Sequence, residues 1–293
     1  MTEPVRRLCV IGVGLIGGSF ARALRERGLV QEVVGVGRSR PNLEQAKRLG
    51  VVDRFTHDAA AAARGADLIL LATPVRAMPG IVEALRGALA PKAIITDAGS
   101  TKAGVVRAIE PLLPSSVQFV PGHPIAGQEK TGVSASKADL FQDHWVILTP
   151  TARTAKPALQ KVGGLWKQCG ARVELMEAEE HDRVFGAVSH LPHMVAYALV
   201  DTILQWEKET PLLGYSAGGL KDFTRIAQSS PEMWRDICLE NQEAILEAMD
   251  RYLQTFRKLR NLIKLKDEAG LKNLFIKARK VRKQITAARR SRP

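Results

Sequence analysis

With 293 residues, 45% of them hydrophobic and 25% charged, the chain is long enough for two domains and a large buried core. No apolar run approaches the roughly 18 residues that span a bilayer, no secretory signal opens the chain, and three scattered cysteines argue against a disulfide framework or a zinc site, so we expect a cytoplasmic protein without a membrane partner. The net charge of +13 belongs to residues 251–293, because residues 1–250 hold 28 basic and 28 acidic side chains.

The N-terminal half alternates short apolar segments with amphipathic helical segments. This alternation predicts parallel strands joined by right-handed crossovers, and therefore an α/β domain with a doubly wound sheet of the Rossmann type. Strands are expected at 5–11, 32–36, 67–72, 93–96, 118–120 and 145–148, and helices at 19–27 and 42–49.

A glycine-rich turn separates the first strand from the first helix and reads Gly12-Val13-Gly14-Leu15-Ile16-Gly17. Gly12 permits a tight turn, Gly14 lets the backbone approach a pyrophosphate, and Gly17 lets the helix pack closely on the strand. The helix N-terminus at Leu15 and Ile16 supplies amide donors to the phosphates. The turn therefore predicts a dinucleotide site; the alternative is a glycine turn without a ligand.

The end of the second strand determines which dinucleotide we expect. NAD enzymes usually place an acidic residue there, but this chain reads Gly37-Arg38-Ser39-Arg40. Arg38, Ser39 and Arg40 could hold a 2′-phosphate, which favours NADP over NAD; the alternative is two solvated arginines and NAD bound without the acidic contact. After the 67–72 strand, Thr73 and Pro74 either close over the cofactor or form a plain turn.

Two polar residues follow later strands of the same sheet, at the edge where such sheets bind ligands. Ser100 comes after the 93–96 strand, either as a site residue or as the N-cap of a helix from Thr101. His123 comes after the 118–120 strand, in a segment that we expect to be a loop. A neutral histidine accepts a proton near pH 7. His123 is therefore the candidate base of a dehydrogenase.

The C-terminal half has helical periodicity. We expect helices at 179–206, kinked by Pro192, at 220–227, at 231–265, and a final basic helix. The domain boundaries are predicted as 1–176 for the dinucleotide-binding domain and 177–293 for an all-helical domain. An apolar stripe on the 231–265 helix indicates core or dimer contacts: Ile237, Ile245, Leu246, Met249 and Leu253.

Five segments in this order resemble the prephenate and arogenate dehydrogenases, from about residue 5 to Trp234 and onward. The resemblance implies oxidative decarboxylation of prephenate or arogenate in tyrosine biosynthesis, and a homodimer formed through the helical domain, without an added regulatory or chorismate mutase domain. The segments are the glycine turn, Asp97-Ala98-Gly99-Ser100-Thr101-Lys102, Gly122-His123-Pro124-Ile125-Ala126-Gly127-Gln128-Glu129, Ser189-His190-Leu191-Pro192-His193 and Lys221-Asp222-Phe223-Thr224-Arg225.

The resemblance also implies roles for individual residues. His123 matches the catalytic histidine, and Ser100 would bind the same hydroxyl and orient the imidazole. Arg225 matches the arginine that binds a substrate carboxylate, with Lys221 one helical turn earlier. His193 would reach the substrate side chain. Supporting positions are His190, Glu129 and Trp234.

Two other functions remain open at this point. One is a 3-hydroxyacid dehydrogenase, which would need a catalytic lysine and has no use for the segment around His123. The other is a non-enzymatic binder of dinucleotides or of nucleic acid through the basic tail. The tail has apolar residues between its basic ones, as in a helix with one solvated basic face, and it lacks aromatic interleaving. We therefore do not expect a nucleic-acid partner.

Overall fold

The computed structural model describes residues 3–128 and 131–291, with side chains up to residue 285. Glu129, expected as a supporting position, lies outside the described residues. The chain divides into two compact units, Met1–Ile245 and Leu246–Pro293.

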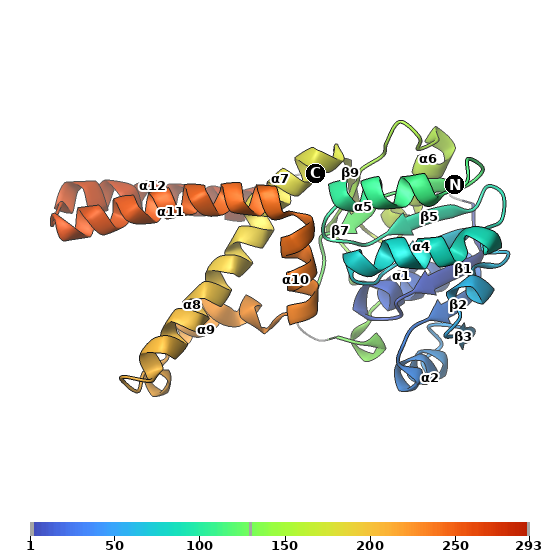
Figure 1. The fold of residues 1–293 in the computed structure, drawn as a ribbon, viewed down its shortest axis with the longest axis horizontal. Coiled ribbons are helices and arrows are strands. Elements are labelled where there is room, and N and C mark those ends of the chain that lie inside the picture. Colours follow the sequence, from blue (N-terminus) through green and yellow to red (C-terminus); the bar gives the residue numbers. More distant parts are fainter. Residues whose placement is uncertain (1–2, 129–130, 292–293) are drawn as a thin grey trace. The chain divides into compact units, whose positions relative to one another are not determined.

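The first unit contains the predicted doubly wound sheet (Figure 1). Six parallel strands lie in the order β3-β2-β1-β4-β5-β6. The strand order reverses between β1 and β4, and open sheets of this kind bind ligands at that point, outside the carboxyl ends of the strands. The strands are β1 (Val5–Ile11), β2 (Val30–Val36), β3 (Arg54–Thr56), β4 (Leu68–Leu71), β5 (Ile94–Asp97) and β6 (Gln118–Val120).

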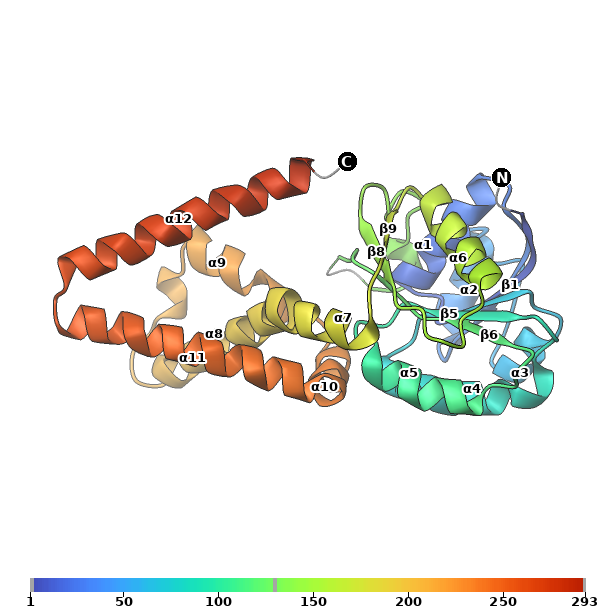
Figure 2. The same cartoon turned by 90° about the horizontal axis from the view of Figure 1, so that it is seen from above.

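Helices cover both faces of this sheet (Figure 2). One face packs on α1 (Leu15–Glu26) and α6 (Lys156–Gln168), where the rings of Phe20 and Trp166 lie 4.4 Å apart. The other face packs on α3 (Ala59–Ala63), α4 (Met78–Leu85) and α5 (Ala103–Ile109) through residues such as Met78 and Ile109. Because both faces are buried, the central strands are apolar almost throughout. The remaining helix, α2 (Arg40–Arg48), belongs to the same core cluster as α1 and α6 through Leu43 and Ala46.

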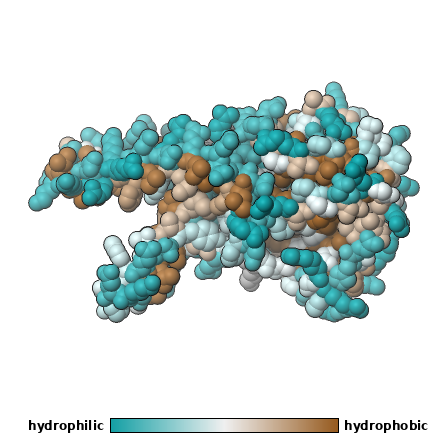
Figure 3. Space-filling view, viewed as in Figure 1, coloured by the Kyte–Doolittle hydropathy of each residue, from teal (hydrophilic) through white to brown (hydrophobic). Residues whose placement is uncertain are grey.

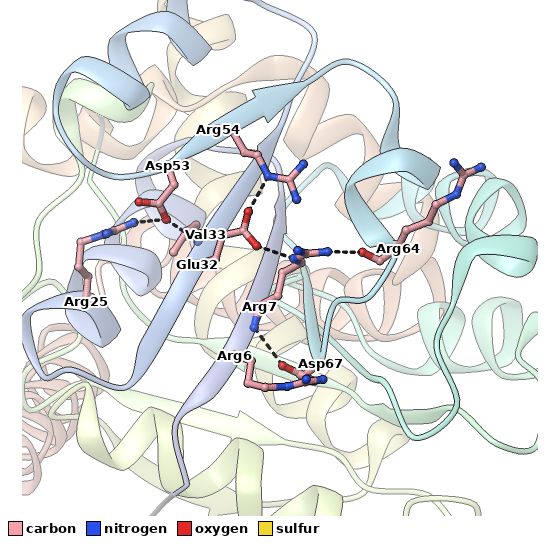
Figure 4. Close-up of polar contacts among 9 residues, drawn as sticks. All are labelled: Arg6, Arg7, Arg25, Glu32, Val33, Asp53, Arg54, Arg64 and Asp67. Carbon is pink, nitrogen blue, oxygen red and sulfur yellow. Dashed lines mark hydrogen bonds and ion pairs between the residues drawn. The ribbon is translucent and has the colours of Figure 1, made fainter.

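Charged side chains join neighbouring strands of the sheet (Figure 4). Glu32 on β2 accepts hydrogen bonds from Arg7 on β1 at 2.5 Å and from Arg54 on β3 at 2.6 Å. Asp67, just before β4, accepts from Arg6 at 2.9 Å and from the backbone amide of Arg7 at 2.9 Å. The Arg54 hydrogen bond is the largest cause that lowers the pKa of Glu32. These half-exposed pairs align the strands and add little net stability.

A second sheet departs from the predicted arrangement. It contains β7 (Gly122–Pro124), β8 (Trp145–Leu148) and β9 (Arg172–Leu175), in that order. The 145–148 segment therefore does not extend the doubly wound sheet. His123 was expected in a loop but lies on β7, which pairs antiparallel with β8 and places His123 opposite Ile147. The pairing holds the histidine on a strand and not on a free turn.

The helical part of the first unit begins directly after β9. Its first long helix is interrupted as predicted near Pro192, because α7 (Ala178–Phe185) and α8 (Leu191–Glu207) are joined by a π-helical turn at Gly186–His190. The expected 231–265 helix is instead two helices, α10 (Pro231–Glu240) and α11 (Gln242–Lys264), separated at Asn241. Between α8 and α10 in sequence lie α9 (Gly218–Thr224) and a 3₁₀ turn at Arg225–Gln228.

The second unit, Leu246–Pro293, is a helical hairpin of most of α11 and of α12 (Glu268–Ser291). Lys266 adopts a positive φ of 54° in the turn between the two helices. Apolar side chains of both helices are exposed and appear as brown areas among the polar surface in Figure 3. No helix among the described residues has the length and apolarity needed to cross a bilayer.

Candidate active site

The glycine turn has the geometry of a phosphate cradle. Gly12 has a φ of +100°, and a Cβ there or at Gly17 would overlap backbone oxygen. A Cβ on Gly14 would meet nothing within 4 Å, so open space faces this residue. No side chain caps α1 within the described part of the chain, which leaves the first amides of α1, at Leu15 and Ile16, available to an anion.

Thr73 and Pro74 lie beside this turn. The backbone nitrogen of Thr73 stands 3.2 Å from where a Gly12 Cβ would be, and the Thr73 hydroxyl is buried without a hydrogen-bond partner in the described residues. Pro74 precedes a 3₁₀ turn at Val75–Ala77. The structure therefore brings together the glycine turn and the end of β4, as a dinucleotide site requires.

Arg38, Ser39 and Arg40 follow β2 and differ in whether their side chains already have partners in the protein. Ser39 is the N-cap of α2 and accepts from the Asn42 amide at 3.4 Å. Arg40 forms an ion pair with Glu44 at 2.9 Å. Arg38 is exposed, and its guanidinium forms no hydrogen bond or ion pair with the described residues. Its charge helps to lower the pKa of Glu232 on α10, after the hydrogen bonds that Glu232 accepts.

His123 is buried, with 8% of its surface exposed, and its surroundings are unusually rich in ionisable groups. Its Nδ1 lies 2.9 Å from Nε2 of His181 on α7. The Phe185 ring packs edge-on against His123, with centroids 5.1 Å apart. Burial lowers the pKa of His123 well below its ordinary value, and the nearby His181 and Lys102 lower it further. The imidazole is therefore neutral near pH 7 and able to accept a proton.

Ser100 lies in the segment between β5 and α5, half-buried and close in sequence to buried Lys102. It is not a helix cap, because α5 begins at Ala103, not at Thr101, and has no side-chain cap from its own N-terminus. No described residue hydrogen-bonds its hydroxyl. Lys102 Nζ contacts the Asp97 carboxylate and donates to the Gly122 carbonyl at 2.8 Å, which ties the Ser100 segment to the strand of His123.

A chain of contacts leads from His123 to His193. The His193 ring stacks on Trp234 at 3.8 Å between centroids, and Trp234 lies 5.8 Å from the His190 ring. Asn241 connects His190 to the first part of this site, since its Nδ2 donates to the backbone oxygen of Asp182 at 2.7 Å and lies 3.1 Å from His190 Nδ1. Both contacts come from the residue at which α10 ends and after which α11 begins.

The two predicted cationic residues, Lys221 and Arg225, lie after α8 in the sequence. Lys221 is on α9 and Arg225 begins the 3₁₀ turn that follows, and both are exposed. Both elements pack against α8, which carries His193. The end of this turn is held by Tyr197, whose hydroxyl donates to the Ser229 carbonyl at 3.0 Å.

Four residues at this site were not among the predicted site residues: Lys102, His181, Asp182 and Asn241. Lys102 stands in a motif that was already singled out, but its burial could not be inferred from spacing. His181 and Asp182 are adjacent in a charged helical segment that resembles a solvated face. The contact of His181 with His123 spans 58 positions, and no local pattern encodes it.

Comparisons with known proteins agree with this geometry. A family model for the prephenate dehydrogenase nucleotide-binding domain matches residues 20–175, and one for the prephenate dehydrogenase dimerization domain matches residues 177–277. The cyclohexadienyl dehydrogenase of Zymomonas mobilis is 40% identical over 98% of this chain and 99% of its own length. The prephenate dehydrogenase of Bacillus subtilis is 38% identical over 96% of this chain and 76% of its own length.

Solved structures have the same architecture. The prephenate dehydrogenase of A. aeolicus, crystallised in complex with hydroxyphenyl propionate and NAD+, superposes with a TM-score of 0.91 at 39% identity and covers 97% of this chain and 100% of that one. An arogenate dehydrogenase from Synechocystis superposes with a TM-score of 0.78 at 28% identity, over 95% of this chain and 99% of that one.

Proposed function

The chain belongs to the prephenate dehydrogenase family, and from that premise we propose that it catalyses the NAD(P)-dependent oxidative decarboxylation of prephenate or arogenate in tyrosine biosynthesis. The observation that carries the proposal is His123, a buried neutral imidazole beside the carboxyl edge of a dinucleotide-binding sheet, in contact with the helical part through His181. The 3-hydroxyacid alternative is not favoured, because the family models and the curated relatives are prephenate or cyclohexadienyl dehydrogenases. The relatives do not favour a non-enzymatic binder.

The chemistry needs one residue that both takes and returns a proton. The substrate has a ring hydroxyl opposite a quaternary carbon that bears a carboxylate. When bound, the nicotinamide accepts the hydride from the hydroxyl-bearing carbon. His123 accepts the hydroxyl proton, the bond to the carboxylate breaks, carbon dioxide leaves, and the electron pair of that bond completes the aromatic ring. The ring oxygen then recovers its proton from His123, so no net proton is released.

The cofactor is a nicotinamide dinucleotide, and we propose that NADP is preferred over NAD. The open space at Gly14 and the free amide ends of α1 fit a pyrophosphate. The segment after β2 has no acidic residue for the ribose hydroxyl, and Arg38 is available to a 2′-phosphate. Ser39 and Arg40 would contribute less, since both already have local partners.

Substrate binding is assigned to the helical part. Arg225 would pair with one substrate carboxylate through its planar guanidinium, and Lys221 would add positive charge. Ser100 would donate to or accept from the ring hydroxyl, because its own hydroxyl has no partner in the described protein. His193, fixed by stacking on Trp234 and by a 2.9 Å contact of Nδ1 with the Ser189 carbonyl, would meet the substrate side chain.

The remaining assignments concern the whole chain. We propose a homodimer formed through the helical domain, since both helices of the second unit expose apolar side chains. We propose a nucleotide-binding domain of residues 1–176 and a helical domain of residues 177–293, supported by family models that match residues 20–175 and 177–277. A cytoplasmic location rests on cysteine usage and stays a prediction.

The function is tested by initial rates with prephenate and arogenate, each with NAD and NADP. We expect turnover of one or both substrates, and a loss of kcat by about 10²- to 10⁴-fold in His123→Asn, the usual range for a general base, with KM changed little. His144→Gln is the matched control, because this histidine is half-buried and its imidazole hydrogen-bonds, among the described residues, with the Gln142 carbonyl alone. Unchanged turnover in His123→Asn would contradict the proposal.

A further inference from the structure

Three buried side chains form a line that ends at the proposed base. His123 Nδ1 lies 2.9 Å from His181 Nε2, and His181 Nδ1 lies 2.8 Å from Asp182 Oδ1. His123 is 8% exposed, His181 is fully buried, and Asp182 is 5% exposed. Both distances are ordinary hydrogen-bond lengths, so each pair must have one donor and one acceptor.

The direction of these hydrogen bonds follows from Asp182. Its Oδ1 accepts from the Lys102 amide at 2.7 Å and its Oδ2 from the Ala103 amide at 2.9 Å, at the N-terminus of α5. Two amide donors on one carboxyl group favour the ionised, acceptor-only form. His181 Nδ1 must therefore donate to Asp182.

The same logic fixes the next imidazole. A neutral His181 that donates from Nδ1 has an unprotonated Nε2, which can only accept. His123 Nδ1 must then be the donor in the contact with His181. The proton of neutral His123 is thus on Nδ1, and its Nε2 carries the free lone pair.

We propose that His181 and Asp182 are positioning residues that hold His123 in the tautomer with Nε2 free to accept the substrate's hydroxyl proton, and that they stabilise the imidazolium while it holds that proton. This inference rests on the proposed function for the identity of the reaction. Once Nε2 is protonated, His123 Nδ1 still donates to His181, and Asp182 supplies the compensating negative charge one imidazole further away.

The charges around His123 make such a partner necessary. Burial is the largest cause that lowers the pKa of His123 and so disfavours a positive charge there, and His181, Lys102 and His190 act in the same direction. Lys102 is itself matched by Asp97. Asp182 is therefore the acidic group that faces the imidazole pair from α7, and its two amide bonds oppose the rise of its pKa that burial causes. The transient imidazolium at His123 is stabilised because the hydrogen-bonded line from His123 through His181, here called the relay, ends in the Asp182 carboxylate.

The test compares His181→Phe with His181→Gln. Phenylalanine keeps a ring against Phe185, whose centroid lies 4.5 Å from that of His181, but removes both hydrogen bonds. Glutamine loses the ring but keeps an oxygen that can accept from His123 Nδ1. We expect kcat/KM to fall at least tenfold in His181→Phe, with a smaller loss in His181→Gln. If the role were packing alone, the order of the two variants would be reversed, and that result would overturn the proposal.

A second measurement does not depend on turnover. Nitrogen-15 spectra of the ligand-free protein, labelled at histidine and assigned with His123→Asn, should show protonated Nδ1 and unprotonated Nε2 at residue 123 near neutral pH. The spectrum should lose that tautomer in His181→Phe and keep it in His144→Gln. A wild-type His123 protonated at Nε2 would refute the relay.

The acid limb of the kcat/KM profile gives a third readout. In Asp182→Asn the carboxylate no longer stabilises the imidazolium, so this limb should move to lower pH as kcat/KM falls, and an unmoved limb would count against the relay. Wild-type protein that turns over neither substrate would refute the proposed function instead, while the spectra would still report the tautomer.

Discussion

Arg38 is the residue on which we expect cofactor choice to depend. Arg38→Ala should raise the KM for NADP by about 10- to 100-fold, the equivalent of the ~1.5–3 kcal/mol of a charge-assisted hydrogen bond, and change the KM for NAD little. The matched control is Arg40→Ala, because Arg40 already pairs with Glu44 and should matter less. An NAD preference above about tenfold in the wild-type enzyme, measured as kcat/KM, would contradict the reasoning from Arg38.

At the same scale, site residues could be predicted from the sequence only where a local pattern points to them, and not where they meet through contacts between distant segments. His123 and Ser100 could be singled out because each follows a predicted strand of a sheet whose ligand edge is known in advance. His181 and Asp182 could not, because a charged pair on a helix indicates solvent unless the packing of α7 on α5 is known. Of the three side chains in the line from His123 to Asp182, the sequence therefore pointed only to His123, and the roles of Ser100, Lys221 and Arg225 stay predictions.

At the scale of elements, alanine substitutions of two glycines in the same turn should have different effects, one on cofactor binding and the other on stability. Gly14→Ala adds a methyl group into open space, so we expect a normal melting temperature and a raised KM for the dinucleotide. Gly17→Ala forces a methyl group against the Gly12 carbonyl and Val10, so α1 must move away from β1. We expect the melting temperature to fall in this variant.

Both variants are measured by thermal unfolding without cofactor and by cofactor titration. A destabilised Gly14→Ala protein with an unchanged KM for the dinucleotide would mean that this glycine serves the fold, not the phosphates.

The elements that sequence reasoning placed correctly are those determined by local patterns. The five parallel strands from β1 to β6 that it named have apolar runs and turn signals of their own, whereas short β3 has neither. The 145–148 run has the same local pattern, yet it pairs with β7 in another sheet, because pairing is a tertiary choice. The break at Asn241 was also missed, since the apolar stripe continues through it and the contacts of Asn241 with Asp182 and His190 are not visible in the sequence.

At the scale of the whole molecule, the second unit should hold the dimer together. Phe256 on α11 and Phe275 on α12 are 54% and 55% exposed, which is costly for large apolar side chains in a monomer. The double variant Phe256→Glu, Phe275→Glu should reduce the mass measured by analytical ultracentrifugation from that of a dimer to that of a monomer. Leu49→Glu, an equally drastic change at a 44% exposed position of the nucleotide-binding part, should leave the mass unchanged.

A wild-type protein that sediments as a monomer at micromolar concentration would contradict the dimer, and so would a double variant with undiminished mass. The charge of the basic tail does not require a nucleic-acid partner, because it is compatible with a solvated helix face.

Asp182 is the helix cap of an element that it does not belong to. Asparagine, serine and threonine are interchangeable with aspartate at many helix N-termini, because all offer an oxygen to the first amides. Here the exchange would keep one acceptor oxygen where the amides of Lys102 and Ala103 now bind one carboxylate oxygen each, and it would remove the negative charge behind His181. Other capping residues are therefore not equivalent to aspartate at position 182. A redesign that considered only helix capping would accept substitutions that remove the carboxylate on which, in our proposal, the His123 imidazolium depends.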